Sequence, residues 1–311
     1  MIRTAFVMGA GLGTRLRPLT DLLPKPLIPV FQKPLITFAF DHLLSLGVDR
    51  LIVNTHHLSE KYDEAFPDYR YGGHEILFRH ERVLLETGGG IKNIEQLVGG
   101  ETFIVHSGDI LTDLPLQAAI DAHRRSGRLS TLVLRSGGGP LQVALDTTTG
   151  NVLDIGNRIG TEPDTQKFLY ASIALLEPEI FAHIPEQEKI SIVPIWTDLI
   201  RDQPGSVGGV VLDQGNWWDL GEVNRYLDVH RFFSRPGYRF NIPVDKGWPQ
   251  RIHPSAKVSG VTLTGTISID ADVELAPGTE LTDIVIWPET KFSSPIRCSN
   301  GILTPIGFVT A

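Results

Sequence analysis

Residues 9–20 of this chain read GAGLGTRLRPLT, and residues 24–26 read PKP. The glycine-rich run follows Thr4–Met8, a short apolar segment that predicts a buried first strand. A glycine-rich turn after a strand lets backbone N–H groups come close to phosphate oxygens. The dinucleotide fingerprint needs a third glycine where this chain has Thr14, and the run contains no Gly-Lys-Ser/Thr of a P-loop. The run therefore predicts a phosphate-binding loop of another kind.

Strands and helices are expected to alternate along most of the chain. The expected strands are short and mostly apolar, at residues 4–8, 50–54, 75–78, 102–106, 168–176 and 207–213. The expected helices are longer, and several begin or end at proline or glycine, at residues 34–47, 55–66, 90–97, 115–127, 192–202 and 222–233. This alternation predicts an α/β fold: a Rossmann-like, mostly parallel mixed sheet with helices on both faces. Ligands of such sheets bind beyond the carboxyl ends of the strands, where Gly9 and Asp109 fall.

A different pattern begins at residue 251. An aliphatic residue or threonine recurs every six positions, at Ile252, Val258 and Thr264, and the count restarts at Ile267, Val273, Thr279 and Val285. A period of six predicts a short C-terminal left-handed β-helix of hexapeptide repeats. The chain is therefore expected to have a catalytic domain at 1–235, a linker at 236–250 and the β-helix at 251–311. We expect the β-helix to cap the main domain or to join two subunits in a homodimer.

Composition excludes several classes of protein. The formal net charge is −8, and no block of Lys or Arg predicts binding to nucleic acid or to a membrane surface. Cys298 is the single cysteine, which excludes a disulfide framework. The first apolar run is too short for a signal peptide, and no stretch has the apolar length of a membrane span. These features predict a soluble, cytoplasmic protein with no nucleic-acid and no membrane partner.

Four motifs in a fixed order resemble the signature of the sugar-phosphate nucleotidylyltransferases, the NDP-sugar pyrophosphorylases. They are the run at 9–20 with its PKP, ETGGG at 86–90, GDI at 108–110 and WDLG at 218–221. The resemblance implies an enzyme that uses Mg²⁺ to join a nucleoside triphosphate to a sugar 1-phosphate, releasing pyrophosphate. The segment 87–90 is similar to the bacterial branch with N-acetylmuramate-1-phosphate uridylyltransferase and the mannose-1-phosphate guanylyltransferases. UTP with an amino sugar 1-phosphate is the first expectation, and GTP with mannose or heptose 1-phosphate is the alternative.

The resemblance and the chemistry of the side chains together indicate which residues act on the phosphates. Asp109 and Asp219 are the expected Mg²⁺ ligands, because magnesium binds oxygen ligands and often only one or two carboxylates. Arg15 carries a planar fork suited to the leaving pyrophosphate, and Lys25 is placed between two prolines that direct its ammonium toward the α-phosphate. Arg15, Lys25 and Asp109 form the expected catalytic set.

The remaining expected contacts are divided between the two substrates. Nucleotide binding is expected from the phosphate loop and the segment after it, at Gly9, Ala10, Gly11, Gly13, Thr14, Glu86, Thr87, Gly88 and Gly89. An alternative for Gly88 and Gly89 is that successive glycines only permit a sharp turn into the next helix. Sugar-phosphate binding is expected from Gly108, Ser172 and Lys189. Ser172 lies where many relatives have glycine, and Lys189 has the alternative of a mobile surface side chain.

Two other functions stay open at this point. A catalytically silent sensor or regulatory subunit would keep the fold, but it would be expected to lose the metal aspartates or the loop cations first. An additional acetyltransferase activity would fit the hexapeptide repeats, but the repeat region is short for such a site.

Overall fold

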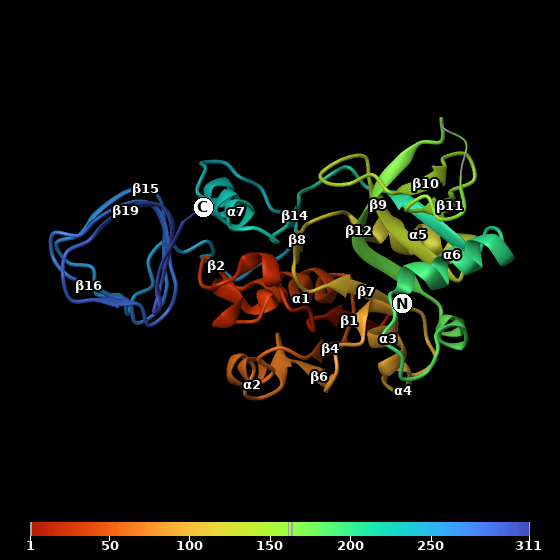
Figure 1. Cartoon of the computed structure of the whole chain (residues 1–311), viewed down its shortest axis with the longest axis horizontal. Helices are drawn as coiled ribbons and strands as arrows, with labels where there is room; N and C mark the ends of the chain where they lie inside the picture. Colours follow the sequence, from red (N-terminus) through yellow and green to blue (C-terminus); the bar gives the residue numbers. More distant parts are fainter. Residues whose placement is uncertain (1, 161, 163, 311) are drawn as a thin grey trace.

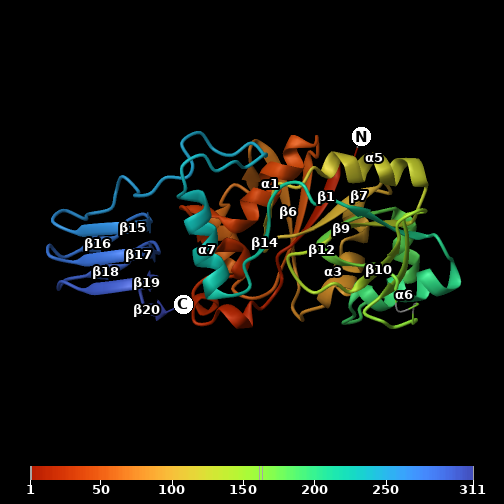
Figure 2. The same cartoon turned by 90° about the horizontal axis from the view of Figure 1, so that it is seen from above.

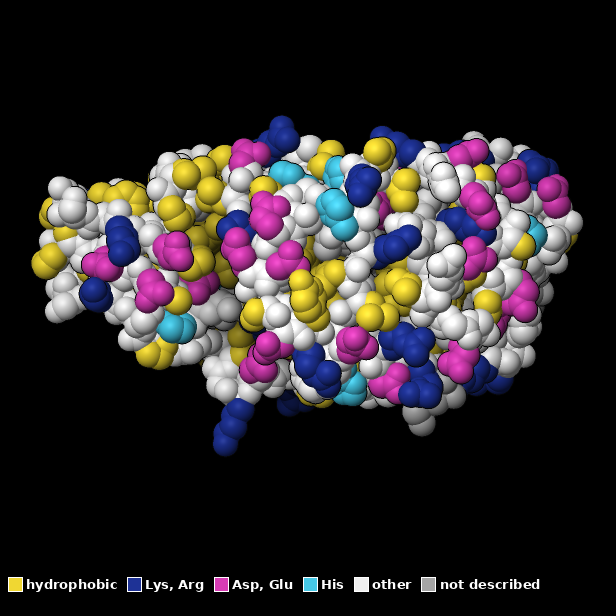
Figure 3. Space-filling view, turned by 90° about the horizontal axis from the view of Figure 1, so that it is seen from below, with side chains coloured by type: hydrophobic (Ala, Val, Ile, Leu, Met, Phe, Trp, Pro, Cys, Tyr) yellow, Lys and Arg dark blue, Asp and Glu magenta, His cyan; other side chains and the backbone are white. Residues whose placement is uncertain are grey.

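The computed structural model describes residues 2–160, 162 and 164–310. Figures 1 and 2 show an α/β body with the residues from about 251 onward stacked against one end of it. Within the described residues, no helix combines the length and the apolar character that crossing a bilayer requires. On the face drawn in Figure 3, acidic and basic side chains are interspersed rather than gathered into a patch of one sign.

The body is built on a ten-stranded sheet with the order β10-β11-β13-β9-β12-β7-β1-β4-β6-β5. Its strands are β1 Thr4–Met8, β4 Arg50–Thr55, β5 Arg70–Tyr71, β6 His74–His80, β7 Phe103–Ser107, β9 Ser130–Arg135, β10 Val143–Asp146, β11 Asn151–Ile155, β12 Lys167–Leu176 and β13 Val207–Val211. Pairing is parallel between β7, β1, β4 and β6 and between β9 and β13. Strand β12 lies antiparallel between β7 and β9, so the sheet is mixed.

Helices cover both faces of this sheet, as the sequence predicts. They are α1 Leu35–Ser45, α2 Glu60–Ala65, α3 Glu86–Asn93, α4 Glu95–Val98, α5 Leu116–Ser126, α6 Ile192–Asp202 and α7 Val223–Phe233. Side chains of β1 alternate between the two faces, because successive residues of a strand point to opposite sides. Phe6 joins the core formed with α3 and α6, whereas Val7 joins the core formed with α1 and α5.

Two helix starts differ from the prediction. The helix expected over 55–66 begins at Glu60, because Thr55 completes β4 and Leu58 has a positive φ of 47°. The helix expected from Gly90 begins at Glu86, and it ends before Ile94, where a second short helix follows. Backbone hydrogen bonds to a distant segment hold its first turn, and periodicity does not reveal such bonds.

From residue 251 the chain forms a stack of parallel strands, called here the C-terminal stack. Strands β15 Thr262–Ile269, β17 Glu280–Ile286 and β19 Arg297–Thr304 are parallel, β20 Gly307–Thr310 closes the edge antiparallel, and β16 Glu274–Leu275 pairs with β18 Lys291–Phe292. Thr262 pairs with Glu280, which is three repeats of six further on. The register shifts by one residue between Thr264 and Ile267, where the sequence count restarts.

The C-terminal stack packs on the body through a shared apolar core. Trp287 and Tyr226 of α7 are both fully buried in it, and the Trp287 Nε1–H donates to the Tyr226 hydroxyl over 3.1 Å. The connecting segment also contacts the body, because Trp248 Nε1–H donates to the carbonyl of Val30 over 3.0 Å. Val30 belongs to a short hairpin of β2 Pro29–Val30 and β3 Lys33–Pro34.

Candidate active site

The expected metal ligands come together at the carboxyl ends of β1 and β7. Asp109 follows β7 and precedes β8 Ile110–Thr112, and Asp219 ends β14 Trp217–Asp219. Strands β8 and β14 pair antiparallel with Asp219 opposite Ile110. Two aspartates that are 110 residues apart in the sequence are thereby placed side by side.

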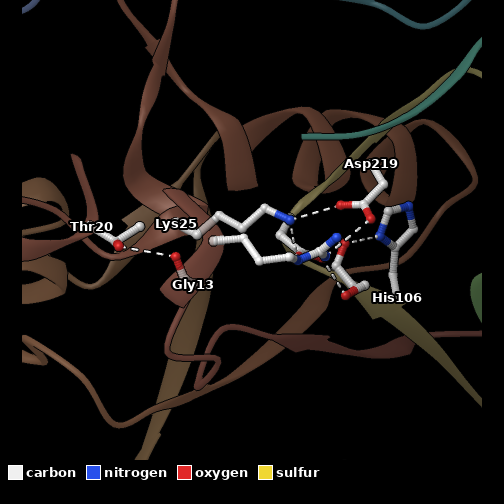
Figure 4. A network of polar contacts seen from close by, with 8 residues as sticks. Gly13, Thr20, Lys25, His106 and Asp219 are labelled. Carbon is white, nitrogen blue, oxygen red and sulfur yellow. Dashed lines mark hydrogen bonds and ion pairs between the residues drawn. The ribbon is translucent and has the colours of Figure 1, made fainter. Parts of the chain in front are cut away.

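Lys25 bridges the two aspartates, and Figure 4 labels it together with Asp219. Its Nζ lies 2.7 Å from Oδ2 of Asp109 and 2.8 Å from Oδ1 of Asp219, and its side chain is only 6% exposed. A 3-10 turn over Lys25–Leu27, with Pro24 before it and Pro26 inside it, fixes the backbone from which the lysine projects. One cation and two carboxylates therefore converge on a single point.

Asp109 is held in its charged form. Burial by itself would raise the pKa of Asp109, but the charge of Lys25 and hydrogen bonds from Lys25 and Ser107 keep this pKa below its ordinary value. The Ser107 hydroxyl donates to Oδ1 of Asp109 over 2.7 Å. An ionised carboxylate is the form that binds a metal ion.

Arg15 lies beside Asp219 but remains accessible. Its Nη2 is 3.6 Å from Oδ2 of Asp219, and 65% of its side chain is exposed. Gly221 leaves room for the guanidinium, since a Cβ at that position would lie 2.7 Å from Nη2 of Arg15. The guanidinium can therefore reach a ligand phosphate without leaving the site.

Glycine is required in the phosphate loop for a different structural reason at each position. Gly13 has a φ of +60°, and its carbonyl accepts a hydrogen bond from the Thr20 hydroxyl over 3.0 Å. Gly9 packs against β4, because a Cβ there would lie 2.7 Å from the carbonyl oxygen of Asn54. A Cβ at Gly11 would meet nothing within 4 Å, so the backbone there is open to a ligand.

A cavity of about 440 Å³ opens in front of this loop. Most of the residues expected for the nucleotide and for catalysis line it: Ala10, Gly11, Gly13, Thr14, Arg15, Lys25, Glu86, Thr87 and Asp109. Gly9, Gly88 and Gly89 are outside this lining. The volume is within the range of small-molecule sites.

Gly88 and Gly89 lie behind the cavity wall. Their amides donate to the carbonyl of Ile190 over 2.8 and 3.0 Å, and a Cβ at Gly89 would lie 2.3 Å from the carbonyl oxygen of Glu188. Close packing on the segment before α6 therefore explains both glycines, in line with the structural alternative. Their contact with a nucleobase stays a prediction. Glu86, with a φ of +62°, and Thr87 face the cavity.

Asn54 and Glu81 are site residues that the sequence analysis missed. Asn54 lines the cavity, and its Oδ1 accepts from the amide of Gly9 over 2.8 Å. Its amide group donates to Oε1 of buried Glu81 over 2.7 Å, and Oε2 of Glu81 accepts from the amide of Leu85 over 3.0 Å. This pair connects the phosphate loop to the segment at 85–87. The available signal was a polar residue at the carboxyl end of β4 and another just after β6.

A second cavity of about 320 Å³ lies on the other side of Asp219. It shares Arg15 and Gly221 with the first cavity, whereas Asp219 lines the second cavity and not the first. Glu222 and Arg225 add one charge of each sign to its wall. The two cavities therefore meet at Arg15 and Gly221, and Arg15 is paired there with Asp219.

Ser172 lines this second cavity in a strained conformation. The φ of Ser172 is +60°, a backbone conformation that residues other than glycine rarely adopt. The register of β12 against β9 shifts between Tyr170 and Ala174, which displaces the strand at this position. The indole N–H of Trp217 donates to the carbonyl of Ala171 over 3.0 Å and holds the distorted segment.

The other two expected sugar-phosphate residues line neither cavity. Gly108 allows close packing of β7 on β1: its amide donates to the carbonyl of Met8 over 2.9 Å. Lys189 is 57% exposed, with its Nζ 3.8 Å from Oε1 of Glu86, on the side of the first cavity. Binding of the sugar phosphate by Gly108 and Lys189 stays a prediction.

The donor set fits a magnesium ion that is completed by ligand phosphates. Asp109 and Asp219 point at one position, because a single ammonium contacts both. In the part of the chain that the structure describes, no group of three or more His, Cys, Asp or Glu side chains forms a fuller metal site. Magnesium is often bound by one or two carboxylates together with substrate phosphates and water.

Comparison with known proteins places the chain in a family. The family described as "Nucleotidyl transferase" matches residues 4–138. The structure of HddC from Yersinia pseudotuberculosis, complexed with GMP-PN, shares the fold with a TM-score of 0.60 at 21% identity, over 73% of this chain and 98% of that one.

Two curated relatives extend the match. UTP–glucose-1-phosphate uridylyltransferase from a Synechocystis strain is 27% identical, over 96% of this chain and 81% of its own. N-acetylmuramate alpha-1-phosphate uridylyltransferase from Neisseria meningitidis serogroup B is 40% identical, over 72% of this chain and 96% of its own. The resemblance found in the motifs is thereby confirmed, and the chain belongs to the nucleotidyl transferase family as a nucleotidylyltransferase.

Proposed function

We propose that this enzyme joins a nucleoside triphosphate to a sugar 1-phosphate, giving a nucleotide sugar and pyrophosphate. The observation that carries this proposal is the meeting of two cavities at Arg15 and Gly221, beside Asp219. The larger cavity, with its open glycine backbone and Lys25, suits the triphosphate. The smaller cavity suits the sugar phosphate, so that the two reacting phosphates would meet beside Asp219.

The residues of the site match the needs of this reaction. The second pKa of a phosphate monoester is near 6, so the sugar phosphate is largely dianionic at neutral pH and needs no strong general base. The protein must hold two polyanions in line and offset the charge that develops in the transition state. Lys25 and Arg15 supply positive charge, and the open amides of the phosphate loop can donate hydrogen bonds. When bound by Asp109 and Asp219, Mg²⁺ would neutralise phosphate charge.

The proposed substrates are UTP and an amino sugar 1-phosphate. Both curated relatives are uridylyltransferases by name, and the one at 40% identity is named for N-acetylmuramate 1-phosphate. The second cavity has an acidic side chain, Glu222, and a basic one, Arg225, that could select substituents of the sugar. GTP with mannose or heptose 1-phosphate remains the alternative that the substrate panel below tests.

We further propose that the C-terminal stack is a short left-handed β-helix and that it joins two copies of the chain. The pairing of Thr262 with Glu280 after three hexads supports the repeat. At the β20 edge of the stack, Ile306 is 60% exposed and Phe308 is 40% exposed, which leaves apolar surface available. Sedimentation of the intact protein against an Ile306→Glu variant would test the dimer: both sedimenting as monomers would contradict it.

The decisive test is pyrophosphate release from purified protein with Mg²⁺, across the common triphosphates and a panel of sugar 1-phosphates. Release is expected to need both substrates and to be lost with a chelator or in Asp109→Asn. Triphosphate binding measured in parallel separates the outcomes. If no triphosphate binds in the presence of Mg²⁺, the proposed reaction is wrong, and a silent sensor becomes the better description.

A further inference from the structure

The ammonium of Lys25 fills the position at which Asp109 and Asp219, the expected metal ligands, converge. It lies 2.7 Å from Oδ2 of Asp109 and 2.8 Å from Oδ1 of Asp219, as Figure 4 shows for the labelled Lys25 and Asp219. Magnesium binds carboxylate oxygens at about 2.0–2.1 Å. An ammonium group and a metal ion therefore cannot both bridge the same two oxygens.

The other two carboxylate oxygens also face donors. Oδ1 of Asp109 accepts from the Ser107 hydroxyl over 2.7 Å, and Oδ2 of Asp219 faces Nη2 of Arg15 at 3.6 Å. Two carboxylates are thus balanced by two cations, and the charge that would attract a metal ion is already offset. In the described part of the chain, no third His, Cys, Asp or Glu completes the site.

We propose that Lys25 competes with the divalent metal for Asp109 and Asp219, so that the free protein binds metal weakly and acquires it together with the triphosphate. This inference rests on the proposed function for its triphosphate. Lys25 lines the first cavity, so phosphate oxygens placed there offer its ammonium alternative partners. The same phosphates bring metal ligands and negative charge, which releases both aspartates to the metal. Lys25 is thus an internal counter-ion that the substrate displaces.

Manganese binding provides a test that needs no turnover. Mn²⁺ is titrated into nucleotide-free protein, and free Mn²⁺ is measured by electron paramagnetic resonance. Lys25→Met is expected to bind Mn²⁺ at least about tenfold more tightly than the original protein. An adjacent positive charge lowers the affinity of a carboxylate for a proton by about one to three orders of magnitude, and we expect the same direction for a metal cation. With a non-hydrolysable triphosphate present, the gain in Mn²⁺ affinity is expected to be larger in the original protein than in the variant.

Two matched variants make the result specific. Lys92→Met removes the same charge from another largely buried lysine, which pairs with Glu95 over 2.8 Å, and it should leave Mn²⁺ affinity unchanged. The double variant Lys25→Met with Asp109→Asn should lose the increase in Mn²⁺ affinity that Lys25→Met shows alone. Equal affinity in Lys25→Met and the original protein would overturn the inference, as would an equal gain in Lys92→Met or a gain that survives in the double variant. Lys25→Gln serves the same test if the Met variant does not fold.

Failure of the inference and failure of the proposed function give different results. An unchanged Mn²⁺ affinity in Lys25→Met, together with normal pyrophosphate release by the original protein, would overturn only the competition. Tighter Mn²⁺ binding in Lys25→Met, with no triphosphate bound by the original protein, would support the competition for the carboxylates and reject the proposed reaction.

Discussion

The two cavities that meet at Arg15 and Gly221 have walls of different construction. The first is backed by buried groups such as Asn54 and Glu81, which hydrogen bonds tie to the phosphate loop and to the segment at 85–87. The second is bounded by the exposed loop at 138–140 and by Ser172 in its left-handed conformation. A hydrogen-bonded wall holds the triphosphate in one fixed geometry, which the proposed reaction needs for every substrate. A wall made of loops lets a few side chains select the sugar.

The largest expected effect is at Lys25, which bridges Asp109 of the first cavity and Asp219 of the second. Lys25→Met should reduce pyrophosphate release by about 10²–10³-fold, the size of the loss when one positioned electrostatic group is removed from a transition state. Steady-state assays of the variant against Lys92→Met measure this. A loss of less than about tenfold would show that the ammonium acts only on the free protein and not in the reaction.

In the first cavity, Glu81→Gln is expected to weaken the hydrogen bonds that hold the wall. Asn54 and Leu85 donate to different oxygens of Glu81, and glutamine replaces one of these oxygens with an NH2 group. One buried donor is then left unpaired, at a cost of about 1–3 kcal/mol in unfolding free energy. We expect the KM for the triphosphate to rise about tenfold, which corresponds to 1.4 kcal/mol, while the KM for the sugar phosphate changes little.

The control for that variant is Glu177→Gln. Glu177 accepts from the Thr102 hydroxyl over 2.8 Å and lines neither cavity. Its replacement should therefore lower the unfolding free energy and leave both KM values unchanged. Equal shifts of both KM values in Glu81→Gln would contradict a division of the site into two separately built walls.

On the sugar side, Ser172→Gly should change selection more than rate. Glycine adopts a φ of +60° without the penalty of a side chain, so the unfolding free energy should rise by about 1 kcal/mol. The second cavity also becomes wider, and the ratio of kcat/KM values between two sugar 1-phosphates should shift by several-fold, toward the bulkier one. Ser136→Gly, on an exposed loop outside both cavities, is the comparison, and an unchanged ratio would remove Ser172 from sugar selection.

The smallest effect on catalysis is expected from two buried histidines, which should instead make the stability of the fold depend on pH. Burial lowers the pKa of His42 to about 3 and that of His106 to about 4, and their rings lie 6.3 Å apart. Between about pH 6.5 and pH 4, the unfolded chain binds protons that the folded chain does not. Stability should therefore fall as the pH is lowered through this range, by about 1.4 kcal/mol per pH unit for each buried imidazole. Denaturant titrations at pH 7, 6 and 5 measure the slope, which should be smaller in His42→Gln.

The sequence alone was sufficient for the strands of β1, β4, β7 and β12, because buried strands are continuous apolar runs between glycines and polar turns. It also indicated Asp109 and Asp219 through motifs that are long and irregular, and the structure brings both to Lys25. The period of six predicted the region in which the parallel strands of the C-terminal stack appear.

Only the tertiary structure decided which of these residues meet a cavity. Gly88, Gly89 and Gly108 look like ligand-binding glycines in the sequence, but each is packed against a backbone carbonyl from a distant segment. Glu81 has no motif of its own, and it acquires a role because β4 and β6 lie side by side. Local patterns determine strands, turns and the chemical types of side chain. Contacts between segments far apart in the chain depend on sheet order and register, and these are set by the packing of the whole core.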